Sequence, residues 1–449
     1  MITNLEKFSF PPLSNIKPAK TVTLEWNCNG SCLAYSKNDG SLRAINVSLK
    51  ALQKSALSPS RSADWFIHSK YGVVEAPEKP IGSISWHPLL PNVFVTVARD
   101  SFVHCWQCKN TSLYCCNKFK ANGDDSVNFM VKYSKDGSFL AVCSVDGRLS
   151  VFRVVGESNF KPIITIKLTS KVFEFDWNNQ SDCLVCSLEH GKVEIYRLDV
   201  DRPAIYLDQT LQLAASSCDI TTVHCCSNDM FFVAGSKDSQ VQLVDTNELV
   251  AVKSFAKGSD EPIGTVDLFT PSDDHTSTSS KSDTMALLET QNMRGYILVT
   301  YEYGSPAVVY NASQDPEKEE PLLTLEECCT GEFLSVAKFN PSDYNVIAYS
   351  DAQGNTKIQS PGKVIKEARR SELRQSDRRS DARSDGRGDG RGDRRSDGRN
   401  DRRNDGRSDR RNERHSDKNG DHSRDDRRHR RYRTQYDRSD RDIKRQRID

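Results

Sequence analysis

The chain has no long hydrophobic run. No stretch of its 449 residues approaches the roughly 18 consecutive apolar residues of a membrane-spanning helix, and the first ten residues, MITNLEKFSF, contain no basic segment that leads into an apolar one. Secretion and membrane insertion are therefore not expected. The 14 cysteines should then be thiols in a reducing compartment rather than a disulfide framework.

The common signatures of catalysis are also missing. There is no Gly-rich phosphate loop, no nucleophile elbow and no pair of carboxylates at a meaningful interval. Two Cys-x-x-Cys pairs, Cys105/Cys108 and Cys183/Cys186, are separated by 75 positions, whereas a zinc ribbon has its pairs about 15–20 residues apart. We therefore expect no enzyme, no metal and no cofactor, and interpret these cysteines as small buried hydrophobic residues.

Charge divides the chain into two unlike parts. Residues 363–449 contain 31 Lys and Arg against 20 Asp and Glu, a net charge of +11, whereas residues 1–362 contain 32 against 42, a net charge of −10. The overall charge of +1 conceals this difference. An acidic body with a basic tail predicts that any polyanion would be bound by the tail.

One interval recurs in the acidic body. The residue pairs 13 positions apart are Trp26 and Asp39, Tyr133 and Asp146, Trp177 and His190, and Cys225 and Asp238; Trp86 and Asp100 are 14 apart, with one more residue in the HPLLPN turn. Each window predicts two short strands and the start of a third, as in FMVKYSKDGSFLAVCSVDGRLSVFRV (residues 129–154). The sequence is therefore an internal repeat of β-structure.

Four antiparallel strands every 40–45 residues or so are typical of a propeller blade. Windows begin at Trp26, Trp86, Tyr133, Trp177, Cys225, Leu268 and Phe339. We predict an all-β, seven-bladed propeller over residues 21–361, with insertions at 48–80 and 270–293. The last window lacks a fourth strand, which residues 1–20 should supply through LEKFSF, so that deleting residues 1–12 is expected to lower thermal stability.

The repeated aspartates are interpreted as structural. Asp39, Asp100, Asp146 and Asp238 fall in tight turns before the third strand, where a carboxylate accepts hydrogen bonds from the turn. His87 precedes Pro88 in what should be a surface turn, and no nucleophile accompanies it at a known spacing.

These windows resemble the WD-repeat family in a degenerate form, because no Trp-Asp dipeptide and no Gly-His opening is present. The loss of those residues puts the hydrogen-bonded tetrad of typical blades in doubt. TLEWNCNGSCLAYSKNDGSLRAINV (23–47), SISWHPLLPNVFVTVARDSFVHCWQC (83–108) and FFVAGSKDSQVQLVDTNELVAVKSF (231–255) are similar to blades of the WD-repeat subunits of THO complexes. The third of these segments contains a distinctive Glu-Leu-Val.

That resemblance implies a nuclear, non-catalytic adaptor of a THO/TREX assembly, which couples transcription to mRNA packaging and export. Its implied partners are large helical scaffold subunits and a DEAD-box RNA helicase. The alternative is a scaffold of another nuclear ribonucleoprotein, in splicing or ribosome biogenesis. A ubiquitin-ligase receptor would be expected to carry Trp-Asp-x-Arg, which is absent.

The tail, residues 362–449, has too few apolar residues for a core and should be disordered. A weak RNA contact or a nuclear localisation signal is predicted at Arg427, Arg428, Arg430, Arg431, Tyr432 and Arg433. Five Arg-Ser-Asp serines are candidate phosphorylation sites: Ser380, Ser384, Ser396, Ser408 and Ser439. Phosphorylating all five would add roughly −7.5 to −10 charges and nearly cancel the positive charge of the tail.

Overall fold

A computed structural model describes residues 6–9, 20–47, 67–75, 79–109, 112–256, 258–270, 295–312, 320–328, 336–351 and 353–360. All of them belong to one compact unit, residues 1–386. The predicted tail, its arginines and its serines lie outside the described residues. So does most of the segment 270–293.

The described residues form seven four-stranded antiparallel sheets and contain no helix, so the predicted all-β, seven-bladed propeller is confirmed. Blade 1 consists of β2 (Thr21–Trp26), β3 (Cys32–Lys37), β4 (Ser41–Val47) and β5 (Ile67–Glu75). Blade 2 consists of β6 (Ser83–Trp86), β7 (Val93–Val97), β8 (Phe102–Lys109) and β9 (Ser112–Lys120). Blade 3 consists of β10 (Asn128–Tyr133), β11 (Phe139–Ser144), β12 (Arg148–Val155) and β13 (Asn159–Lys167). Blade 4 consists of β14 (Val172–Trp177), β15 (Cys183–Leu188), β16 (Lys192–Asp199) and β17 (Ala204–Gln212). Blade 5 consists of β18 (Ile220–Cys225), β19 (Phe231–Ser236), β20 (Val241–Asp245) and β21 (Ala251–Phe255). Blade 6 consists of β22 (Ile263–Phe269), β23 (Tyr296–Tyr301), β24 (Ala307–Asn311) and β25 (Leu323–Leu325).

Blade 7 combines the two ends of the propeller. Its strands are β26 (Ala337–Asn340), β27 (Asp343–Ser350) and β28 (Thr356–Ser360), and β1 (Glu6–Ser9) pairs with β28 as the fourth strand. The pairing is antiparallel, from Glu6 opposite Ser360 to Ser9 opposite Lys357. The fourth strand therefore comes from the region in which the sequence placed it.

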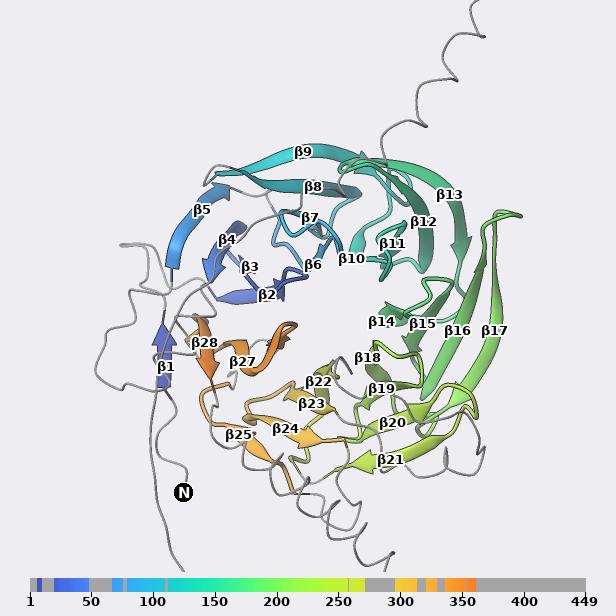
Figure 1. The fold of residues 1–449 in the computed structure, drawn as a ribbon. Coiled ribbons are helices and arrows are strands. Elements are labelled where there is room, and N and C mark those ends of the chain that lie inside the picture. Colours follow the sequence, from blue (N-terminus) through green and yellow to red (C-terminus); the bar gives the residue numbers. More distant parts are fainter. Residues whose placement is uncertain are drawn as a thin grey trace, which may run out of the picture. The chain divides into compact units, whose positions relative to one another are not determined.

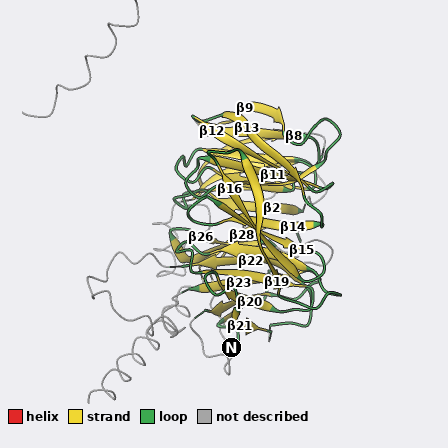
Figure 2. Cartoon of the chain, turned by 90° about the vertical axis from the view of Figure 1, so that its right-hand side faces the viewer, coloured by secondary structure: helices red, strands yellow, loops and turns green. Residues whose placement is uncertain are grey.

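The ring arranges the first strand of each blade around its centre and the fourth strand at its outside (Figure 1). Viewed from the side, the blades form a layer of crossing strands (Figure 2). The segment 48–80 is only partly an insertion, because it contains β5, the outer strand of blade 1.

Hydrophobic packing lies between blades. A single sheet cannot bury both of its faces, and here seven buried clusters fill the seven interfaces between neighbouring sheets. Trp177 of blade 4, for example, stacks on Phe139 of blade 3 with ring centroids 6.1 Å apart. A large residue near the end of a first strand thus packs against the neighbouring blade. We call the residue at which each window begins the anchor of its blade: Trp26, Trp86, Tyr133, Trp177, Cys225, Leu268 and Phe339.

Candidate functional site

The innermost strands are joined by a hydrogen bond across every blade interface, and at six of the seven interfaces this bond lies at one recurring position. Where the anchor is tryptophan, its indole Nε1 donates to the carbonyl of the residue before the anchor in the preceding blade. These bonds are Trp26 to Lys338 (3.4 Å), Trp86 to Glu25 (2.9 Å) and Trp177 to Lys132 (3.2 Å).

Where the anchor is another residue, a side chain of the preceding blade accepts a backbone N–H instead. The acceptors are Ser85 for Tyr133 (3.0 Å), Asp176 for Cys225 (2.9 Å) and Asp267 for Phe339 (2.8 Å). Between blades 5 and 6 the bond is displaced: Thr222 accepts the N–H of Val266 at 3.2 Å, two residues before the anchor Leu268. Residues directly before the anchors therefore bond the ring together at six of the seven interfaces. Sequence reasoning missed them, although a polar residue precedes all seven anchors in the sequence.

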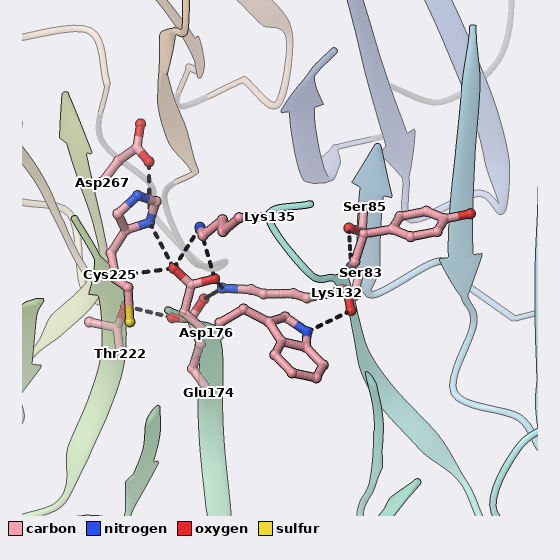
Figure 3. A network of polar contacts seen from close by, with 12 residues as sticks. Ser83, Ser85, Lys132, Lys135, Glu174, Asp176, Thr222, Cys225 and Asp267 are labelled. Atoms are coloured by element: carbon pink, nitrogen blue, oxygen red, sulfur yellow. Dashed lines mark hydrogen bonds and ion pairs between the residues drawn. The ribbon is translucent and has the colours of Figure 1, made fainter. Parts of the chain in front are cut away.

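Six residues that directly precede an anchor meet Lys135 and Glu174 at the centre of the ring. We call these eight residues the central cluster: Glu25, Lys132, Lys135, Glu174, Asp176, His224, Asp267 and Lys338. Figure 3 shows part of the cluster, with Lys132 and Lys135 directed at Asp176 and Glu174. The contributing strands β2, β10, β14, β18, β22 and β26 belong to six different blades.

Asp176 is the most heavily used carboxylate of the central cluster. It is 3 % exposed, and its oxygens lie 3.6 Å from Lys132 Nζ and 3.1 Å from Lys135 Nζ. Burial opposes ionisation, but Lys132, Lys135 and His224 outweigh it, so the pKa of this carboxyl lies well below its usual range. Asp176 is therefore ionised at neutral pH and links blades 3, 4 and 5.

Two further ion pairs extend the central cluster to blades 6, 7 and 1. Lys338 Nζ lies 3.3 Å from Asp267 and 4.0 Å from Glu25. Burial lowers the tendency of Lys338 to be charged, but Asp267 and Glu25 more than compensate, which raises its pKa. For Glu25 burial dominates and raises the pKa from 4.5 to about 6, against the attraction of Lys338.

His224 occupies the space between two carboxylates. Its Nδ1 lies 3.9 Å from Asp176 and 3.7 Å from Asp267. Burial nevertheless lowers the pKa of His224 to about 4, because desolvation exceeds the attraction of both carboxylates. The imidazole is therefore neutral at pH 7, and the arrangement ties blades together rather than pairing a nucleophile with a base.

The predicted turn aspartates lie elsewhere, each between the second and third strands of its own blade. Asp39 accepts the N–H of Ser41 and Asp100 that of Phe102, both at 2.9 Å. Asp146 accepts the Ser144 hydroxyl at 2.5 Å and pairs with Arg148 at 3.0 Å, and Asp238 accepts the Ser236 hydroxyl. The structure does not bring these residues together.

Blade 7 has an equivalent turn aspartate that the sequence prediction did not include. Asp351 accepts the N–H groups of Gln353 at 3.0 Å and Asn355 at 2.7 Å, and Lys357 Nζ lies 3.0 Å from it. The spacing from its anchor, Phe339, is 12 rather than 13. That difference hid it from a fixed-interval comparison.

His87 differs from its predicted surface position. The side chain is buried, and its Nδ1 accepts the N–H groups of Leu89 at 3.1 Å and Leu90 at 3.3 Å. The ring packs over Gly137, where an added Cβ would lie 2.6 Å from the imidazole. The histidine therefore closes the turn and fills the interface between blades 2 and 3.

One hydrogen bond of the tetrad that the sequence put in doubt is present in blade 2. Trp106 Nε1 on the third strand donates to Thr96 Oγ1 on the second strand at 2.9 Å. The distinctive Glu248-Leu249-Val250 forms the turn between β20 and β21, where Leu249 has a φ of 56° and Asp245 accepts the N–H of Glu248 at 3.0 Å. Val250 is 52 % exposed at this turn.

Among the described residues no group of three or more His, Cys, Asp or Glu could hold a metal ion. Cys105, Cys108, Cys183 and Cys186 are all buried in strands. The described ranges also contain no helix long and apolar enough to cross a membrane.

Comparison with known proteins agrees with this architecture. The family model for the WD domain, G-beta repeat, matches residues 113–153, which comprise the outer strand of blade 2 and the first three strands of blade 3. The chain is thus a seven-bladed β-propeller in which one segment matches the WD-repeat model. Propellers built from WD repeats serve as platforms for protein interactions.

Two relatives resemble the chain over about half of its length. The WD repeat-containing protein AAC3 of Dictyostelium discoideum is 24% identical over 251 residues, which cover 53% of this chain and 49% of that protein. THO complex subunit 3 of Arabidopsis thaliana is 24% identical over 243 residues, covering 53% of this chain and 67% of that protein. The chain thus matches about half the length of the first relative.

A solved structure shares the fold. The β-propeller domain of Cps50 (Swd1) from Myceliophteria thermophila superposes with a TM-score of 0.55 at 12% identity, over 80% of this chain and all of that domain.

Proposed function

We propose that the protein is a non-catalytic adaptor of a THO/TREX-type assembly in the nucleus, which couples transcription to the packaging and export of mRNA. The observation that carries the proposal is the similarity to THO complex subunit 3, which extends over 67% of that protein. Three segments quoted from the sequence point to the same family. Large helical scaffold subunits and a DEAD-box RNA helicase are the proposed partners.

The geometry supports an adaptor in a specific way. In the central cluster the carboxylates of Asp176 and Asp267 are occupied by lysines and backbone N–H groups. Such a cluster stabilises the ring, and the faces and outer strands are then available to partners. A rigid ring presents those surfaces without a large ordering cost on binding.

Affinity purification of the tagged full-length chain from nuclear extract tests the proposal. We expect large helical THO subunits and a DEAD-box helicase to be recovered, both with the full chain and with a chain that ends at residue 361. Recovery of spliceosomal or pre-ribosomal proteins in their place would favour the alternative, a scaffold of another nuclear ribonucleoprotein.

The tail is proposed to add a weak RNA contact. The +11 net charge of residues 363–449, and Tyr432 among the arginines at 427–433, support this role. Phosphorylation at the five Arg-Ser-Asp serines should weaken the contact by cancelling charge. Titrating a 363–449 peptide with single-stranded RNA at two salt concentrations measures both effects, and equal affinities of the unmodified and phosphorylated forms would rule out the switch.

A further inference from the structure

A β-bulge in the outer half of blade 2 places two cysteines side by side. In the pairing of β8 with β9, Trp106 lies opposite Cys115 and Cys105 lies opposite Asn117. Cys116 is therefore the additional residue of β9, without a partner in the ladder. A bulge redirects the side chain of its additional residue, and here that residue is a cysteine.

The Cys116 thiol contacts Cys105. Its Sγ donates to the carbonyl oxygen of Cys105 at 3.3 Å, whereas the Cys105 thiol donates to the carbonyl oxygen of Glu157 at 3.8 Å. Cys105 is fully buried in the cluster between blades 2 and 3, whereas Cys116 is exposed on the outer strand. One thiol is thus open to solvent and the other is held behind it.

The surroundings make the two thiols chemically unequal. The neighbouring Cys105 thiol lowers the pKa of Cys116 from 9.0 to about 7, against the effect of burial. The Cys116 thiol, together with burial, raises the pKa of Cys105. Since the thiolate is the nucleophile, Cys116 is the thiol equipped to react first.

We propose that Cys105 and Cys116 form an oxidant-sensitive pair that closes to a disulfide when the protein meets a hydroperoxide. The Cys116 thiolate attacks one peroxide oxygen, which breaks the O–O bond and leaves Cys116 as a sulfenic acid and one molecule of water after protonation. Cys105 Sγ then attacks Cys116 Sγ. The departing hydroxide takes the proton of Cys105, so that two thiols and one hydrogen peroxide become one disulfide and two waters.

Two neighbouring cysteines provide internal controls. Cys115 is also exposed, but it lies opposite Trp106 and its thiol donates to the carbonyl of Asn117 at 3.4 Å. Cys108 is buried in the cluster that also contains Cys32 of blade 1. Neither thiol donates to Cys105.

The sequence allows a direct test on the full-length protein. Trypsin cleaves after Arg99, Lys109 and Lys118, so Cys105 and Cys108 leave in one peptide and Cys115 and Cys116 in the next. Reduced protein is treated with hydrogen peroxide, blocked with an alkylating agent, digested without reductant and analysed by mass spectrometry. The two peptides should appear joined, two hydrogens lighter than their sum, and fragment ions should assign the bond to Cys105 and Cys116.

Variants then decide which thiols react. C116S should lower the joined fraction by at least about tenfold, whereas C115S should change it less than about twofold. The melting temperature of each variant verifies that blade 2 is still folded. Joining that survives C116S but is lost in C115S, or a wild-type chain whose Cys116 is oxidised without any link to Cys105, would overturn the proposal.

Discussion

Aspartates serve two different purposes in this propeller. A turn aspartate such as Asp146 bonds to Ser144 and Arg148, two residues away on either side, and is 38 % exposed at its side chain. Asp176 bonds to Lys132, Lys135 and Cys225, which are 41 to 49 positions away in neighbouring blades. A carboxylate repeated along the sequence therefore stabilises its own blade, whereas the carboxylates of the central cluster hold different blades together.

Replacement of Asp176 should have the largest effect. D176A leaves Lys132 and Lys135 without this carboxylate, and breaking a buried ion pair costs about 3–5 kcal/mol. D182A is the matched control, because Asp182 pairs with Arg197 in a contact about 40 % exposed on both sides, and such surface pairs contribute about 0–1 kcal/mol. Urea unfolding of both variants measures the difference, and equal losses would contradict the distinction.

His224 should make stability depend on pH between 6.5 and 4. Its pKa falls from 6.5 to about 4 on folding, so the unfolded chain takes up the proton first as the pH decreases. The contribution of His224 to the free energy of unfolding is therefore full above pH 6.5. It decreases by about 3 kcal/mol as the pH falls towards 4.

The variant H224Q tests this dependence. Its free energy of unfolding should decline less than that of the wild type between pH 6.5 and 4, as measured by urea unfolding at several pH values. Glu25 acts in the same range with the opposite sign, because its pKa rises from 4.5 to about 6 on folding and stability therefore increases as the pH falls through that range. The difference between wild type and H224Q isolates the histidine. The depressed pKa of Asp176 acts only below pH 3.8. Parallel pH profiles of wild type and H224Q would show that His224 is not the titrating group.

The turn aspartates should give the smallest effect. D146A removes the hydrogen bond to Ser144 and the pair with Arg148, but solvent can replace both, so we expect a loss of about 0.5–1.5 kcal/mol. A thermal shift several degrees smaller than that of D176A, measured in the same buffer, is the expected result. A loss as large as that of D176A would remove the contrast between the two groups.

Most of the fold could be predicted from local patterns. The 13-residue interval from Trp26, Tyr133, Trp177 and Cys225 spans a turn, the second strand and the turn before the third strand, all of which are set by neighbouring residues. The missing fourth strand of the last window also pointed to the N-terminal residues, where β1 lies. The turn aspartate of blade 7, Asp351, was not predicted, because it follows its anchor by 12 positions rather than 13.

The central cluster could not be predicted in the same way. Lys132, Asp176 and His224 each look like an ordinary polar residue before an anchor, and nothing in one window shows which charge the next blade presents. The polar residue before every anchor was a visible signal of position only. Likewise, the spacing of Cys105 and Cys116 does not reveal the β-bulge that places Cys116 beside Cys105.

Strand alternation, turns, the number of blades and the contrast between an acidic body and a basic tail could be read from the chain, because they depend on residues close together in it or on composition. Which charges meet at the centre of the ring could not, because ion pairs require distances of a few ångströms and closing the ring brings together residues some 40 positions apart or more. Which cysteines lie together depends on the strand register of blade 2, which the spacing of the residues does not show.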